Sequence, residues 1–206
     1  ELQWVGSRGR FRHVVGLYYF KDDGVSEVAQ HFGLFALRPQ RADYASNTDA
    51  KAVFAQADYD FADRWTTTLG IRYTEEKKDA SQLETPTTLY TNQPIAVGPA
   101  GGPAASRHQL DDARRKEKNF SPTATLQWKP DEGVMLYARF ARGFKGGGFD
   151  MQLDAPQARA VNEFEFEDEK VTAYEIGGKF ELLNGALQIN VAAFRSEFDN
   201  LQVSTL

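Results

Sequence analysis

The segment Val171–Phe198 most constrains the fold, because it contains two alternating stretches joined by Asn184-Gly185. In the first stretch one face contains Thr172, Tyr174, Ile176, Gly178 and Phe180, and in the second stretch one face contains Leu187, Ile189, Val191 and Ala193. A period of two residues is typical of a β-strand with one apolar and one polar face. Asn-Gly favours a tight hairpin turn, and each stretch has about the ten residues that a tilted transmembrane strand requires. The segment therefore predicts a membrane-spanning β-hairpin.

The same alternation recurs along the rest of the chain. The expected strands are Glu1–Trp4, Phe11–Phe20, Lys51–Phe61, Trp65–Glu75, Asn119–Trp128 and Val134–Gly143, followed by the hairpin. Short turns near 62–64, 129–133 and 181–185 alternate with long connections at 21–50, 76–118 and 144–170. Outer-membrane barrels have this asymmetry of short periplasmic turns and long outer loops. The pattern predicts an all-β fold, an antiparallel up-and-down meander of about 7–8 strands that forms an incomplete wall of a larger transmembrane β-barrel.

Aromatic residues fall near both ends of the expected strands, with the parity of the apolar face. Aromatic side chains make up 13% of the chain, with 15 Phe and 8 Tyr. Amphipathic rings gather at the two membrane–water boundaries. We expect the following to lie at the membrane interface: Phe61, Trp65, Tyr73, Trp128, Phe140 and Phe180. The alternative is aromatic core packing in a soluble β-protein.

Composition excludes several other classes of protein. The 206 residues include no cysteine, which excludes disulfide scaffolds and thiol catalysis. A net charge of −5 provides no basic field for nucleic acid. No apolar run is long enough for a transmembrane helix, and no signal-peptide pattern is visible at Glu1. Because the last residues stop in mid-pattern, we expect the chain to be a fragment.

Three stretches resemble TonB-dependent outer-membrane receptors. YARFARGFKGGGFD (Tyr137–Asp150) resembles the family's Y-x-x-x-x-x-G-F-K-x-G-G-F stretch. Val171–Val203 resembles its Y-E-x-G-x-K … L-N-x-A-x-F … D-x-Q-V segment, and the opening ELQW and VVGLYYF resemble its E-L-R … W-x-x-G-L-Y-Y segment. The matching motif positions are Tyr174, Glu175, Gly177, Lys179, Asn190, Ala192, Phe194, Asp199 and Gln202.

This resemblance implies a barrel of roughly 22 strands with an amino-terminal plug in its lumen. Residues 1–206 would be part of the barrel domain, with the plug domain and the C-terminal strands outside the sequence. The implied function is import of a scarce nutrient, such as a ferric siderophore or cobalamin, across the bacterial outer membrane. The implied partners are outer-membrane lipid and lipopolysaccharide, the plug, the TonB protein and a ferric chelate or other small ligand, with no nucleic acid. A passive pore, a structural barrel and a soluble ligand-binding β-barrel are the alternatives.

Two sets of polar residues are candidate sites. Positions of inward parity form a polar wall, for which we expect lumen or plug contacts at Arg72, Gln127, Glu175 and Lys179; the alternative is simple solvation of the lumen. Arg139, Arg142 and Lys145 gather where a strand enters a long connection. They are candidates for an anionic ligand at the extracellular rim, although lipopolysaccharide phosphates or plain solvation would also explain them.

The remaining motifs indicate no chemistry of their own. Gly146-Gly147-Gly148 lacks the following Lys-Ser/Thr of a phosphate loop, so we expect a flexible loop. The acidic run Glu163–Glu169 lacks calcium-loop spacing, which favours a solvated loop over a cation site. No G-x-S-x-G or similar activated nucleophile occurs, and the three histidines lie in different elements. We therefore expect no enzyme, no metal site and no cofactor.

Phe194 and Phe198 break the parity of the second hairpin arm. A β-bulge near Ala193 would restore them to the apolar face. Alternatively, both rings lie above the membrane. We favour the second explanation, because Asp199 and Asn200 follow directly.

Overall fold

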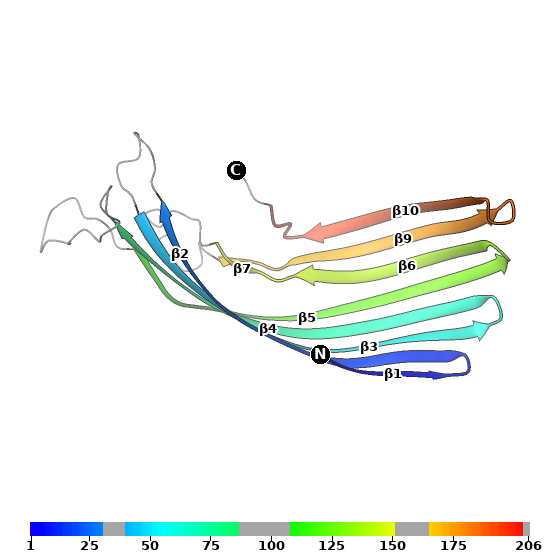
Figure 1. Cartoon of the computed structure of the whole chain (residues 1–206), viewed down its shortest axis with the longest axis horizontal. Coiled ribbons are helices and arrows are strands. Elements are labelled where there is room, and N and C mark those ends of the chain that lie inside the picture. The colour runs from blue at the N-terminus through cyan, green and yellow to red at the C-terminus, as the bar shows by residue number, and fades with distance from the viewer. Residues whose placement is uncertain (31–39, 87–107, 151–164, 204–206) are drawn as a thin grey trace, which may run out of the picture.

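One curved antiparallel sheet accounts for nearly all of the described chain (Figure 1). The computed structural model describes residues 1–30, 40–86, 108–150 and 165–203. The sheet has eight strands in the order β1-β2-β3-β4-β5-β6-β9-β10, so that chain neighbours pair along a meander. Their bounds are β1 Leu2–Arg8, β2 Phe11–Gln30, β3 Gln40–Ala62, β4 Trp65–Pro86, β5 His108–Asp131, β6 Val134–Lys145, β9 Glu169–Leu182 and β10 Leu187–Asp199. A separate pair, β7 (Gly148–Phe149) and β8 (Glu165–Phe166), lies between β6 and β9 in sequence.

The predicted fold class is confirmed: the described residues form an all-β antiparallel meander whose sheet is open at β1 and β10. No helix occurs among the described residues, and hence none with the length and apolarity to cross a membrane. The short turns between β1 and β2, β3 and β4, β5 and β6, and β9 and β10 lie at one end of the sheet (Figure 1). Gly133 and Gly185 in two of these turns have φ of 77° and 87°, which a glycine adopts without strain.

The strands are longer than the sequence predicted. β2, β3, β4 and β5 have 20, 23, 22 and 24 residues, so large parts of the expected connections 21–50 and 76–118 are strand. Those expected boundaries were wrong because both faces of the extensions are polar, and alternation marks a strand only where one face is apolar. Their ladder is nonetheless continuous, with Lys21 paired with Asp49 and Gln30 with Gln40.

The register separates two faces across the whole sheet. Val53 pairs with Tyr73 and Tyr73 with Phe120, so residues of apolar parity lie side by side on what we term the outer face. These side chains remain exposed, with Ile71 at 53% and Ile176 at 63%. The buried apolar residues of the described ranges are alanines of the opposite, inner face: Ala50, Ala52, Ala80 and Ala113. An apolar face of this extent indicates contact with lipid or another apolar partner.

The β9–β10 ladder decides the position of Phe194 and Phe198. β10 pairs with β9 without interruption from Leu187 to Asp199, so there is no bulge near Ala193. Phe194 lies opposite Glu175 and Phe198 opposite Val171, on the inner parity. The bulge explanation is therefore wrong, whereas the height of the two rings relative to the membrane stays a prediction.

Glycines on the inner face accommodate large rings from neighbouring strands. Gly177 on β9 pairs with Tyr137 on β6, and a Cβ at Gly177 would lie 2.6 Å from the Tyr137 ring. Gly16 on β2 receives the Phe54 ring of β3 in the same way. Because such positions have room for a ring only while they lack a side chain, each pair fixes the register of its two strands.

Substituting Gly177 with alanine tests this role. The methyl group displaces the Tyr137 ring, and we expect the free energy of unfolding of the full-length protein to fall by about 1–3 kcal/mol. Gly143→Ala is the matched control, because its Cβ would meet only Val171 Cγ1, at an ordinary 3.6 Å. Urea unfolding in detergent micelles measures both variants. Equal stability of the two would contradict the ring-accommodation argument.

Candidate functional site

Ion pairs and hydroxyls line the inner face near the short turns. Arg12 on β2 donates to both carboxylate oxygens of Asp60 on β3, at 2.6 and 3.0 Å. Asp60 also accepts a hydrogen bond of 2.7 Å from Thr66. Asp58, one pleat further, accepts another of 2.7 Å from Thr68. A fork of two charge-assisted bonds is the strong geometry for such a pair, so this part of the wall satisfies its own charges.

Arg72 lies further along the same face and has a different environment. Its guanidinium carbon lies 5.0 Å from the centre of the Tyr18 ring and 5.7 Å from that of Phe54. Its Nε donates to Thr74 Oγ1 at 3.1 Å. No carboxylate of the described residues pairs with it. The rings hold the guanidinium in place through cation–π contacts, and none of the described residues accepts a hydrogen bond from its terminal amino groups.

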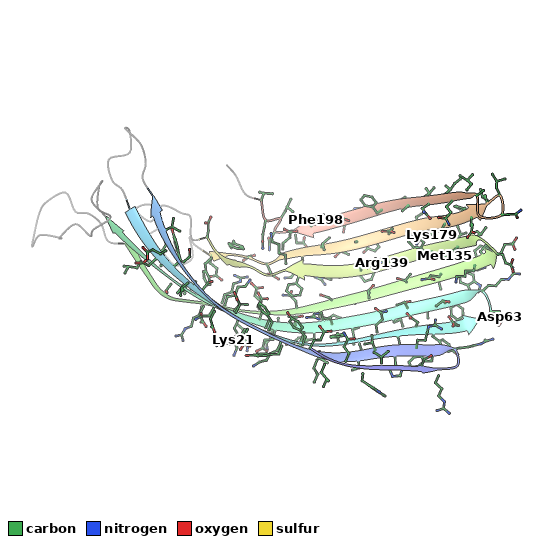
Figure 2. All side chains as sticks on the ribbon, in the orientation of Figure 1. Lys21, Asp63, Met135, Arg139, Lys179 and Phe198 are labelled. Carbon is green, nitrogen blue, oxygen red and sulfur yellow. The ribbon has the colours of Figure 1, made fainter. Side chains whose placement is uncertain are left out.

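The other predicted wall residues lie on the inner parity of β5, β6 and β9. Tyr137 donates a hydrogen bond to Glu175, and Lys179 lies across from Met135 on β6 and Asn190 on β10. Gln127 on β5 pairs with Tyr137 in the ladder. Figure 2 places Arg139 and Lys179 on the adjacent strands β6 and β9. The structure thus puts Gln127, Glu175 and Lys179 in one region, and Arg72 on another part of the same wall.

The three candidate rim residues do not share a face. In the β6–β9 ladder Arg139 lies opposite Glu175 and Lys145 lies opposite Glu169, so both cations have inner parity. Arg142 pairs with Thr172 and has outer parity, because it is an odd number of residues from either. Binding of an anionic ligand at the extracellular rim therefore stays a prediction for all three residues, of which Arg142 lies on the outer face and Arg139 and Lys145 on the inner face.

The glycine-rich segment after β6 is bound to the inner face. The amide of Gly147 donates to both oxygens of Glu117 on β5, at 2.9 and 3.2 Å. Lys78 on β4 donates to the Gly147 carbonyl at 2.6 Å and lies 2.7 Å from Glu76. A Cβ at Gly147 would lie 2.7 Å from Glu117 Oε1. The expected flexible loop is instead a buried segment, where glycine permits close approach of backbone and side chains.

Arg115 is the centre of this anchor. It forms ion pairs with Glu117 and Glu165, and lies 3.8 Å from Asp168, with 13% of its side chain exposed. Burial acts to lower the pKa of Arg115, but the hydrogen bonds to Glu117 and Glu165 outweigh burial and raise it above its ordinary value. Part of the acidic run Glu163–Glu169, expected to be solvated, thus binds β5; its first two residues lie outside the described ranges.

The segment after β10 joins the same network. The Gln202 amide donates to Glu169 at 2.9 Å, and its side chain donates to the carbonyl oxygens of Glu167 and Gly146 at 2.9 and 3.3 Å. Sequence analysis missed this anchor. The sequence contains a signal for the anchor: Glu76 and Lys78 share one face of β4, and Arg115 and Glu117 share the same face of the neighbouring β5.

Among the described residues, no three His, Asp or Glu side chains form a group that could hold a metal ion.

The predicted interface aromatics all have outer parity. The Trp65 and Trp128 rings stack with centres 5.5 Å apart, and Phe61 lies 6.1 Å from Trp65. Phe140 packs 5.4 Å from Tyr174. Tyr73 and Phe180 are on the same face. Their location at a membrane boundary stays a prediction.

Residues 2–206 match the family model described as TonB dependent receptor-like, beta-barrel. The chain belongs to this family. It is 25% identical over 154 residues to the metal-pseudopaline receptor CntO of Pseudomonas aeruginosa strain PAO1, covering 74% of this chain and 18% of that protein. Relatives in the family are outer-membrane transport receptors.

Solved structures of TonB-dependent receptors share the fold. The ferric yersiniabactin uptake receptor FyuA from Yersinia pestis matches with a TM-score of 0.72 at 16% identity, covering 98% of this chain and 28% of that one. The closed form of the ferric-catecholate import receptor Fiu from E. coli K12 gives 0.68 at 16% identity, covering 96% and 30%. The chain therefore spans less than a third of each of these proteins.

Replacing Glu117 with glutamine tests the anchor of the glycine-rich segment. The change removes the charge that holds Arg115 and Gly147, and a hydrogen bond to a charged group contributes about 1.5–3 kcal/mol. We expect the Gly147 amide to exchange with deuterium roughly tenfold faster or more, measured by mass spectrometry on the full-length protein. Glu75→Gln, on the outer face of neighbouring β4, is the control and should leave this exchange rate unchanged. Unaltered protection of Gly147 in the Glu117 variant would refute the anchor.

Proposed function

We propose that the complete protein imports a scarce nutrient, a metal chelate such as a ferric siderophore or a related compound, across the bacterial outer membrane. Family membership over residues 2–206 carries the proposal. The two faces of the sheet support it, since an exposed apolar face suits lipid and a polar inner face suits a wet lumen. The similarity to CntO, a metal-pseudopaline receptor, favours a metal chelate as the class of ligand.

We also propose that residues 1–206 are one part of a barrel domain whose lumen holds a plug. The open edges at β1 and β10 support the first statement, because lipid cannot satisfy unpaired strand edges. The inner wall supports the second. Arg12 is matched by Asp60, whereas Arg72 has no carboxylate partner among the described residues, and Arg139 lies opposite Glu175 in the ladder without forming an ion pair with a described residue. Unmatched cations on a wall suit the anionic groups of a plug or ligand.

Energy coupling distinguishes active import from a passive pore. We expect a strain that carries the full-length gene as its single uptake route to take up the radiolabelled metal chelate only when TonB is present. Deleting TonB or dissipating the inner-membrane proton gradient should reduce uptake to background, while binding of the chelate to cells persists. Uptake that continues without TonB would support the passive pore and overturn the proposal.

Two arginines on β6 provide a matched test of the wall. Arg139→Gln removes an inward-facing cation, and we expect the dissociation constant of the chelate, or of its anionic analogue, to rise about tenfold, as for loss of one charged hydrogen bond. Arg142→Gln removes the same charge from the outer parity of the same strand and should leave binding unchanged. Calorimetric titration of the purified receptor measures both. Equal losses in the two variants would contradict the assignment of faces.

A further inference from the structure

The pairing of β5 with β6 stops partway along both strands. Their ladder begins beside the short turn that joins them and ends where Thr123 lies opposite Ala141. Beyond that point β5 stays paired with β4 as far as His108, with one register shift, and β6 stays paired with β9 as far as Lys145. Figure 1 shows β5 continuing alongside β4 past the end of β6. Within the described residues the sheet thus divides into two parts beyond Thr123, and we term this division the seam.

A proline marks the start of the seam. Pro122 is the next residue of β5, and its nitrogen has no hydrogen to donate to a ladder. Proline is therefore tolerated where a strand has a free edge and is rare between two paired neighbours. Pro122 lies opposite Ile71 in the β4–β5 ladder, so the pairing that is missing in the described chain is the one with β6. The residue type thus agrees with the change of β5 from a central strand to an edge strand.

A strap joins the two sides of the seam on the inner face. We define the strap as Gly146–Phe149 and Glu165–Asp168, the described ends of the connection between β6 and β9, within which β7 and β8 pair. The Gly147 amide donates to the Glu117 carboxylate of β5, and Lys78 of β4 donates to the Gly147 carbonyl at 2.6 Å. The strap therefore connects the β6–β9 side to the β4–β5 side through side chains.

The register shows that this contact replaces a backbone pair. Continuing the pairing of Thr123 with Ala141 by six residues along each strand reaches Glu117 and Gly147. A continuous ladder would place these two backbones opposite each other. In the structure the Gly147 amide instead bonds to the carboxylate of Glu117, at 2.9 and 3.2 Å. A side chain thus bridges the seam where a ladder would have joined the two strands directly.

The contacts of the strap are charged and largely removed from water. The side chains of Arg115 and Glu117 are 13% and 7% exposed, and Arg115 also forms an ion pair with Glu165 of the strap. Withdrawal of the strap would leave Glu117 opposite Glu76 without the Gly147 amide. Like charges directly opposite each other are unfavourable in a sheet. The docked strap therefore has a definite set of bonds that favours a closed seam.

The seam is the place in this part of the sheet where two strands can separate with the least loss of pairing. On the other side of β6, Ala141 lies opposite Ala173 and Arg142 opposite Thr172 in a continuous ladder with β9. Separating those strands would break backbone hydrogen bonds at successive positions. Separation of β5 from β6 beyond Thr123 would break the contacts of the strap. The β6–β9 pair can therefore move as one unit relative to β5.

We propose that the strap is a latch and that the seam is a lateral gate in the barrel wall. Release of the strap from Glu117 and Lys78 lets the β6–β9 pair tilt away from β5 and widens the outer mouth of the lumen for the metal chelate. The hinge lies at Thr123 and Ala141, the last paired residues of the two strands. The cargo in this inference rests on the proposed function, whereas the seam and the strap are features of the sheet itself.

Spin labels on the two sides of the seam measure its width in the full-length receptor. Ser121→Cys on β5 and Gly143→Cys on β6 are the label sites, and the 206 residues contain no cysteine that would compete. Dipolar electron paramagnetic resonance gives the distance distribution between the labels. We expect a narrow distribution in the natural background, and a broader one at longer distance when Glu117→Gln removes the charge that holds the strap.

A second label pair controls for general loosening. Ala141→Cys and Ala173→Cys lie opposite each other on the inner face of the β6–β9 ladder, and their distribution should be the same with and without Glu117→Gln. Gly147→Ala is a second latch variant, because its Cβ would lie 2.7 Å from Glu117 Oε1 and displaces the strap without a change of charge. An unchanged distribution across the seam in both latch variants, or equal broadening at both label pairs, would overturn the gate.

Covalent closure of the seam tests whether import requires it to open. A short bismaleimide that joins the thiols of Ser121→Cys and Gly143→Cys holds the two strands together. We expect uptake of radiolabelled iron, supplied as ferric catecholate and ferric hydroxamate chelates, to fall to background while chelate binding persists. The same reagent on Ala141→Cys and Ala173→Cys should leave uptake unchanged. Normal uptake through a receptor whose seam is shown by its mass to be crosslinked would refute the gate.

The two measurements keep this inference separate from the proposed function. If the natural protein imports none of these chelates, the proposed function fails, and the label distances still decide whether the strap controls the seam. A change confined to the pair at Ser121 and Gly143 would then support opening at the seam. Normal import by the natural protein together with label distances that ignore the latch variants would uphold the proposed function and reject the gate.

Discussion

A single register through eight strands is the constraint on which the rest of the structure depends. Side chains alternate along the strands, with register shifts only near the ends of the β3–β4, β4–β5 and β5–β6 ladders. A slip of one residue would transfer every apolar group to the polar face. The sheet keeps apolar residues on one face across its whole width. At the β1 edge Trp4 is paired with Val15, and at the β10 edge Ile189 is paired with Phe180. A thin wall of this kind has no enclosed apolar core, and its buried apolar residues in the described ranges are small alanines. Stability must then come from the ladder, from contacts within each face and from the solvent on either side.

Paired glycines and rings provide part of the register control. The pair of Gly177 and Tyr137 lies on the inner face, and the Tyr137 hydroxyl donates a hydrogen bond to Glu175. Gly6 with His13 forms a similar pair on the outer face, where the His13 ring lies 4.8 Å from Trp4. Each ring can lie flat only where its neighbour lacks a side chain. A slip in register would therefore place each ring against a neighbouring side chain.

Alternation predicted the meander and its faces, and the structure confirmed them wherever one face is apolar. It could not predict the strand extensions such as Lys21–Gln30, because polar residues on both faces carry no periodic signal. It also could not place Gly147 against Glu117, a contact between residues thirty positions apart that depends on how the chain turns after β6. Arg142 illustrates a different limit: proximity in sequence grouped it with Arg139, whereas parity places the two on opposite faces.

Adjacent residues of β4 and β5 face the two different sides of the sheet. Glu76 and Glu117 repel each other across the inner face, and the chain itself supplies Lys78, Arg115 and a backbone amide as compensation. One residue further on each strand, Lys77 and Lys116 repel each other across the outer face, where the described chain supplies a single carboxylate contact. The inner pair thus holds a segment of the protein itself, whereas Lys116 of the outer pair contacts Glu75 of the neighbouring strand.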